Sequence, residues 1–135
     1  MARQFQYHDQ QWEVVDSGLA VGVSTGYLSK ADTRGVVFRC ITDPSRAEVE
    51  ASIRTDDLAG VDDERLWREL GRALIRKAID GSQDTWRTVE SLAEEIGIPP
   101  EEVHGRLENL ANDFVRSARP DEEGRALYTT RRKHN

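Results

Sequence analysis

Hydrophobic and polar residues alternate along the first 60 residues in short runs that are rich in β-branched and aromatic side chains. Within residues 11–15, Trp12 and Val14 fall on one face of an extended chain, and Glu13 falls on the other. Such alternation is typical of a strand with one buried face, and clusters of Gly, Pro, Asp and Ser separate the runs. We therefore expect an antiparallel meander formed by QFQYH, QWEVV, LAVGVS, GVVFRCIT and EVEASIR.

One stretch before residue 60 allows two interpretations. Residues 45–53 begin with Ser45, and Glu48 follows three positions later, which is the pattern of a capping box at the start of a helix. The alternation over residues 49–54 favours a strand instead. Of these two interpretations, we predict the strand.

A longer helix is expected from residue 62, where hydrophobic residues begin to recur at every third or fourth position. Asp62 is a suitable N-cap residue, and Gly81 is a suitable residue to end the helix. The predicted apolar face contains Leu66, Trp67, Leu70, Ala73, Leu74, Ala78 and Ile79. The outer face carries four arginines, which we interpret as solvated in preference to a binding surface: Arg65, Arg68, Arg72 and Arg76.

Two shorter helices joined by a tight turn are predicted from residue 88 onward. The first begins at the N-cap Thr88 and ends at Gly97, which can adopt the left-handed conformation without a steric penalty. Pro100 suits the first position of the next helix, because its fixed φ and missing N–H match that position. The apolar residues at helical spacing are Val89, Leu92, Ala93 and Ile96 in the first helix, and Val103, Leu107, Leu110, Ala111 and Phe114 in the second.

A β hairpin is predicted to follow these helices. Residues 114–118 and 125–130 can pair across residues 120–124, PDEEG, which have a turn-forming residue at each end. Residues 86–87 can add a short strand before the two helices. The order of helix, strand, helix, helix and hairpin over residues 62–130 resembles a winged helix-turn-helix domain, in which the hairpin is the wing.

The chain is therefore expected to have an α+β fold, with an N-terminal antiparallel β meander followed by a winged-helix-like lobe of three helices and a C-terminal β hairpin. The β-rich lobe covers residues 1–60, for which we identify no family resemblance, and the winged-helix-like lobe covers residues 61–135. The linker-like stretch at residues 80–84 is too short to separate independent domains. With 135 residues in total, we expect one integrated unit.

The resemblance implies contacts with double-stranded DNA, because the second helix of such a domain commonly lies in the major groove. The exposed residues of that helix would be Glu101, Glu102, His104, Arg106, Glu108 and Asn109. Arg106 and Asn109 are the types that pair with the edges of guanine and adenine. The residues expected to contact the phosphate backbone are Arg119 and Arg125 in the hairpin, and Arg131, Arg132 and Lys133 in the C-terminal tail. On this hypothesis the protein is a DNA-binding transcriptional regulator.

The charge of the chain argues against DNA binding, which stays the first hypothesis because the winged-helix fold so often serves it. The formal net charge is −6, and residues 81–135 contain eleven acidic and eight basic side chains. An acidic surface repels nucleic acid, and the glutamates of the second helix would face phosphate groups. The alternative hypothesis is a protein-interaction module with a winged-helix fold that binds a partner protein or forms a homodimer. An edge strand or an aromatic patch around Tyr7, Trp12 and Tyr27 could then provide the interface.

Candidate catalytic and metal-binding residues are sparse. No histidine has a second histidine or a cysteine at the spacing of zinc ligands; the three histidines are His8, His104 and His134. Cys40 is the single cysteine and lies in an apolar run, so we expect a buried, unreactive thiol. We therefore expect no metal site, no cofactor and no enzymatic activity. Catalysis would require a pocket that the sequence does not reveal, for example in the β-rich lobe.

The sequence also indicates where the protein acts. No apolar run approaches the roughly 20 residues that a membrane-spanning helix needs. Residues 1–9 lack the apolar core of a signal peptide. We therefore expect a cytoplasmic protein without a membrane partner.

Overall fold

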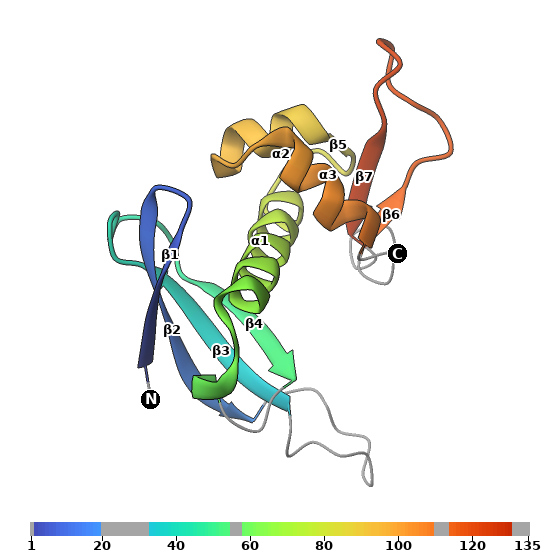
Figure 1. Ribbon diagram of the computed structural model, residues 1–135. Helices are drawn as coiled ribbons and strands as arrows, with labels where there is room; N and C mark the ends of the chain where they lie inside the picture. Colours follow the sequence, from blue (N-terminus) through green and yellow to red (C-terminus); the bar gives the residue numbers. More distant parts are fainter. Residues whose placement is uncertain (1, 20–32, 55–57, 110–113, 131–135) are drawn as a thin grey trace, which may run out of the picture. The chain divides into compact units, whose positions relative to one another are not determined.

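Figure 1 shows the computed structural model of the chain, which describes residues 2–19, 33–54, 58–109 and 114–130. In these residues an antiparallel sheet of four strands is followed by three α-helices and a three-stranded sheet, so the predicted α+β class is confirmed. The chain divides into two compact units, Met1–Leu70 and Gly71–Asn135. This division falls inside α1 (Asp63–Asp80), so that helix contributes residues to both units.

The N-terminal unit contains the predicted antiparallel meander. Its strands pair in the order β1-β2-β3-β4, with Phe5 opposite Trp12 between the first two strands. The strands are β1 (Ala2–Tyr7), β2 (Gln10–Leu19), β3 (Thr33–Cys40) and β4 (Val49–Arg54), and the short helix η1 (Leu58–Gly60) follows them. The stretch that allowed two interpretations is therefore a strand. Residues 20–24 of the expected run LAVGVS lie outside the described residues.

The two faces of this sheet differ as the alternation predicts. One face is buried and consists of Phe5, Tyr7, Trp12, Val14, Val36, Phe38, Cys40, Val49 and Ile53. Cys40 is only 1% exposed, which confirms the buried thiol. On the other face, the guanidinium of Arg39 lies 3.7 Å from a carboxylate oxygen of Glu13 and 3.6 Å from one of Glu48. The side chains of β3 thus alternate between the core and an exposed charged surface.

Helix α1 begins and ends where the sequence predicts. Oδ1 of Asp62 accepts a hydrogen bond of 2.8 Å from the backbone N–H of Arg65, which confirms Asp62 as the N-cap. At the other end, the backbone N–H of Gly81 donates to the carbonyl of Lys77 at 2.9 Å. The predicted residues Leu66, Leu70, Ala73, Leu74, Ala78 and Ile79 are all buried.

Other residues of α1 depart from the predicted pattern. Trp67 is 37% exposed instead of buried, and its indole N–H donates to the carbonyl of Gln6 at 2.7 Å. This bond satisfies the polar edge of the indole while its ring remains in partial contact with water. Ile75 is fully buried although the pattern did not include it. Of the four arginines expected to be solvated, Arg68 is exposed, whereas the other three are half-buried: Arg65, Arg72 and Arg76.

The C-terminal unit contains the predicted pair of helices and the tight turn between them. In the first helix, Oγ1 of the N-cap Thr88 accepts a hydrogen bond of 3.1 Å from the backbone N–H of Ser91. Gly97 has φ 85°, and its N–H donates to the carbonyl of Ala93 at 2.8 Å. The second helix begins at Pro100, as predicted. The two helices are α2 (Val89–Ile96) and α3 (Pro100–Asn109).

The hairpin of the C-terminal unit belongs to a three-stranded sheet. Its strands β5 (Arg87–Thr88), β6 (Phe114–Arg116) and β7 (Leu127–Thr130) pair antiparallel in the order β5-β7-β6. The strands of the hairpin are shorter than expected, because β6 ends at Arg116 and β7 begins at Leu127. Phe114 is buried in β6 and is not part of the second helix, while Leu110 and Ala111 lie outside the described residues.

Candidate binding cleft

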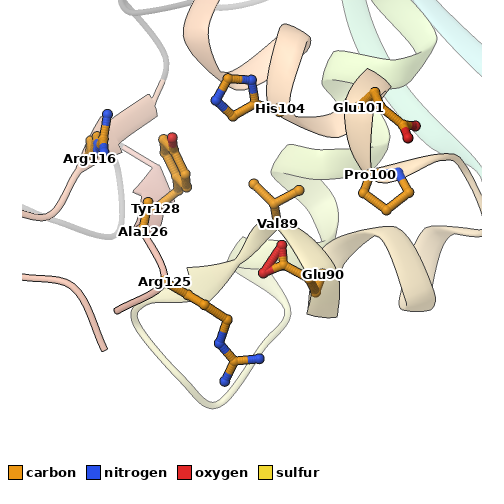
Figure 2. Close-up of a pocket in the computed structure, with 9 residues that line it drawn as sticks. All are labelled: Val89, Glu90, Pro100, Glu101, His104, Arg116, Arg125, Ala126 and Tyr128. Atoms are coloured by element: carbon orange, nitrogen blue, oxygen red, sulfur yellow. The ribbon is translucent and has the colours of Figure 1, made fainter. Parts of the chain in front are cut away.

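A cleft of about 480 Å³ lies within the C-terminal unit (Figure 2). We call it the hairpin cleft, because one of its sides is formed by residues of the C-terminal hairpin. The other side is formed by the first turns of α2 and α3. Its lining residues are Val89, Glu90, Pro100, Glu101, His104, Arg116, Arg125, Ala126 and Tyr128.

Local structure brings these segments together. Thr88 pairs with Leu127 across β5 and β7, so the first residue of α2 lies next to the beginning of β7. Because Gly97 ends α2 in a left-handed turn, the chain reverses at once and α3 begins at Pro100. The start of each helix therefore faces the hairpin, and Val89, Pro100, Ala126 and Tyr128 provide apolar surface in the cleft.

Glu108 of α3 connects the helix to the hairpin at one end of the cleft. Its Oε1 accepts a hydrogen bond of 2.9 Å from the phenolic O–H of Tyr128. The same oxygen lies 3.6 Å from Nη1 of Arg116 and 3.4 Å from Nε2 of His104. Burial is the main cause that raises the pKa of the Tyr128 phenol, and the hydrogen bond to Glu108 raises the pKa further. Figure 2 shows His104 on α3, and Arg116 and Tyr128 on the hairpin strands that adjoin it.

Arg125, at another edge of the cleft, is held by acids of the hairpin loop. Its Nε lies 2.8 Å from Oδ2 of Asp121, and its Nη2 lies 3.5 Å from a carboxylate oxygen of Glu123. Oδ1 of Asp121 also accepts backbone N–H bonds from Arg125 at 2.7 Å and from Glu123 at 2.9 Å. The backbone N–H of Arg125 is the main cause that lowers the pKa of the Asp121 carboxyl, and the side-chain bond to Asp121 raises the pKa of Arg125.

Of the residues expected to contact DNA, the structure describes the side chains of Arg106, Arg119 and Arg125. Arg125 lines the cleft, while Arg106 does not and is half-buried. The Nε of Arg106 is inaccessible to solvent and has no hydrogen-bond partner among the described residues. Arg119 is exposed, and Asn109 is the last residue of α3. The side chain of Asn109 and the whole of Arg131, Arg132 and Lys133 lie outside the described part, as does Tyr27.

Sequence reasoning did not identify the cluster around Glu108. Arg116 faces Tyr128 across β6 and β7, and this register brings both side chains to the same carboxylate. The two hairpin strands were predicted from the sequence, but the register between them was not. The sequence analysis likewise did not single out Glu90, which is in the first turn of α2 and lines the cleft.

Acidic side chains outnumber basic ones around the cleft. The lining residues and their ion-pair partners include five acids, namely Glu90, Glu101, Glu108, Asp121 and Glu123. They include two arginines, Arg116 and Arg125, together with His104. Because each arginine already lies within an ion pair, the positive charge at the cleft is largely compensated inside the unit.

Other kinds of site are not seen in the part of the chain that the structure describes. Within it, no group of three or more His, Cys, Asp or Glu side chains is arranged to hold a metal ion. Nor does any helix there have the length and apolar character to cross a membrane. Comparison of the chain with protein-family models, curated proteins and solved structures finds no match.

Proposed function

We propose that residues 63–130 form a winged helix-turn-helix domain. The order α1, β5, α2, α3, β6, β7 supports this proposal, as does the sheet order β5-β7-β6, in which the hairpin strand β7 also pairs with the strand before α2. The left-handed Gly97 between α2 and α3 adds the tight turn of such a domain. This proposal concerns the fold alone. A function has to be argued from the residues on the surface of the domain.

We infer that this domain serves as a non-catalytic protein-interaction module in the cytoplasm. The observation that carries the inference is the pairing of the hairpin arginines with acids of their own unit. Arg116 lies 3.6 Å from Glu108, and Arg125 lies 2.8 Å from Asp121. A phosphate backbone is bound by cations that replace its counterions, and an acid of the same unit beside each of these two arginines reduces the positive charge that they offer to phosphate. The mixed charges and apolar surface of the hairpin cleft suit a protein surface better.

The lining of the cleft also supports a non-catalytic function. Its described lining residues include no Ser, Thr, Cys or Lys, which are common nucleophiles in covalent catalysis. Its tyrosine donates its proton to a hydrogen bond with Glu108, and burial raises the pKa of that phenol, so Tyr128 remains protonated near neutral pH. These groups orient one another and stabilise the contact between α3 and the hairpin.

DNA binding is the second candidate, and Arg119 is the observation that favours it. This side chain is exposed on the hairpin and forms no ion pair with any described residue. It could contact a phosphate group together with the basic residues predicted for the tail, Arg131, Arg132 and Lys133.

Photo-crosslinking separates these two functions. A photoreactive amino acid at His104 places the probe in the hairpin cleft, and the same probe at the exposed Gln83 serves as the control. Illumination in cells of the source organism is expected to produce discrete protein adducts from position 104 only. In parallel, fluorescence anisotropy with a random-sequence DNA duplex at low salt is expected to show no saturable binding at micromolar protein concentration.

Two outcomes would contradict the proposed function. The first is a nucleic-acid adduct at position 104, accompanied by duplex binding that weakens steeply with added salt. The second is the same set of protein adducts from both probe positions, which would mean that the cleft is not the interaction surface.

A further inference from the structure

We propose that the hairpin cleft binds an extended segment of a partner protein in which a lysine or arginine lies beside an apolar side chain. The proposal rests on the proposed interaction function and specifies the chemistry of its partner. It follows from two properties of the cleft, its apolar surface and the sign of the charges that remain unpaired at its edge.

The apolar surface gives the segment a place for a hydrophobic side chain. Val89, Pro100, Ala126 and the ring of Tyr128 contribute to the lining, and they come from α2, α3 and the hairpin. The volume of about 480 Å³ lies within the range of about 300–1,000 Å³ that is typical of specific binding pockets. An apolar side chain placed there would remove this surface from water, which is the main favourable contribution to association.

The unpaired charges at the cleft are negative. Glu90 and Glu101 are both exposed, and neither forms an ion pair with a described residue. Glu90 is close enough to raise the pKa of Arg125, but it is the smallest cause of that shift, after Asp121 and Glu123. The helix starts at Val89 and Pro100 add only about half a positive charge each. A cation of the partner is therefore attracted to this edge.

An anionic group of a partner is disfavoured at the cleft, because an acid lies beside each of the two arginines. A phosphate or carboxylate group that approached Arg125 would lie close to Asp121, whose Oδ2 is 2.8 Å from Nε of the guanidinium. To bind Arg116, it would have to compete with Glu108, which also accepts the hydrogen bond from Tyr128. Either acid keeps its charge beside the incoming anion, so both arginines favour a neutral or cationic segment.

Defined peptide mixtures test the proposal directly. One mixture contains fluorescein-labelled hexapeptides with two lysines and two leucines at permuted positions among serines. In a second mixture glutamate replaces lysine, and in a third serine replaces leucine. Titration of the full-length protein should give saturable anisotropy changes with the first mixture only. The backbone amide signals of the cleft residues should move in NMR spectra on addition of the same mixture.

A pair of double variants tests whether the cleft is the site. Glu90→Gln combined with Glu101→Gln removes the unpaired acids and should weaken binding of the lysine–leucine mixture roughly fivefold to tenfold. Glu94→Gln combined with Glu122→Gln changes the net charge equally at exposed positions that do not line the cleft, and should leave affinity unchanged. Amide spectra of the unbound variants confirm that both are folded.

Three results would overturn the inference: no saturable binding of the lysine–leucine mixture, equal binding of the glutamate mixture, or equal weakening by both double variants. The last result would show attraction by overall charge without a specific site. If the crosslinks at position 104 still appear while the peptides fail, the interaction function stands and the proposed partner chemistry is wrong. If both fail, the interaction function is wrong as well.

Discussion

Glu108 shows how much a single side chain contributes to the C-terminal unit. In the sequence it is one of several glutamates on an amphipathic helix, and its expected position was the solvent-exposed face. In the structure its carboxylate accepts the hydrogen bond from Tyr128 and lies within 4 Å of Arg116 and His104. Glu108, which was expected to repel DNA, thus forms a structural contact between α3 and the hairpin.

Removing this carboxylate should destabilise the C-terminal unit. Glu108→Ala leaves the Tyr128 hydroxyl without its partner and should lower the free energy of unfolding by about 1–2 kcal/mol. Glu108→Gln keeps an oxygen that can accept the bond and should lose less. Urea denaturation measures both values. Equal losses for the two variants would show that the charge, and not the hydrogen bond, is the important feature.

Tyr128 should also make stability depend on alkaline pH. Its folded-state pKa is raised by burial and by Glu108, whereas the unfolded chain titrates near its ordinary value of about 10. The protonated phenol is therefore favoured in the folded state, and its contribution is complete below about pH 10 and is lost as the pH rises through the folded-state pKa.

Urea denaturation at about pH 9 and about pH 11 tests this dependence. The free energy of unfolding should fall more between these values for the parent protein than for Tyr128→Phe, which has no titrating phenol at this position. The lysines and the remaining tyrosines titrate in both proteins, so their contributions to the free energy of unfolding cancel in the comparison. The same pH dependence in both proteins would contradict the assignment.

At the scale of elements, the turn between α2 and α3 depends on the backbone conformation of Gly97. This residue has φ 85°, which is unfavourable for side chains with a Cβ atom. No heavy atom lies within 4 Å of the place where a Cβ atom would be added, so the penalty at this position is conformational and not steric crowding by neighbours.

Two glycine substitutions in adjoining elements should therefore have opposite effects. Gly97→Ala should lower the free energy of unfolding by about 1 kcal/mol, because alanine is strained in the left-handed region. Gly105→Ala should raise it by about 0.5–1 kcal/mol, because this residue is inside α3 and the added methyl group meets open space. Thermal denaturation of both variants measures the difference, and a stabilised Gly97→Ala variant would contradict the turn geometry.

At the scale of the whole molecule, α1 is the element that both units share. Its first residues belong to the unit Met1–Leu70 and the remainder to the unit Gly71–Asn135. Unfolding of either unit therefore removes the packing of part of one continuous helix. Because helix formation is cooperative along the chain, we expect a substitution that destabilises one unit to destabilise the other as well.

Matched isoleucine variants test this coupling. Ile53→Val removes a methylene from the core of the N-terminal unit, and Ile96→Val does the same in the C-terminal unit. Each should cost about 1 kcal/mol, and native-state hydrogen exchange should show the same loss in the slowest amides of both units. Faster exchange confined to the substituted unit would show that the units unfold independently.

The elements themselves were largely predictable, because their signals are local. The N-caps Asp62 and Thr88, the left-handed Gly97 and the helix start at Pro100 each depend on residues no more than four positions away. The alternation in β1 to β4 likewise reports a half-buried sheet. The positions where the helical pattern was wrong have distant partners: the indole N–H of the 37% exposed Trp67 donates to Gln6, and Phe114 lies opposite Thr130 in the strand that the hairpin prediction gave it.

The sequence by itself determined the α+β class, the order of the elements, and the caps and turns that bound them. Only the tertiary structure decided that Glu108 meets Arg116 and Tyr128, and that the exposed acids Glu90 and Glu101 line the hairpin cleft. The physical reason is that helix caps and strand alternation are set by residues close in the chain, whereas the partners of a charged side chain depend on strand register and helix packing. Those are fixed only when the whole unit folds.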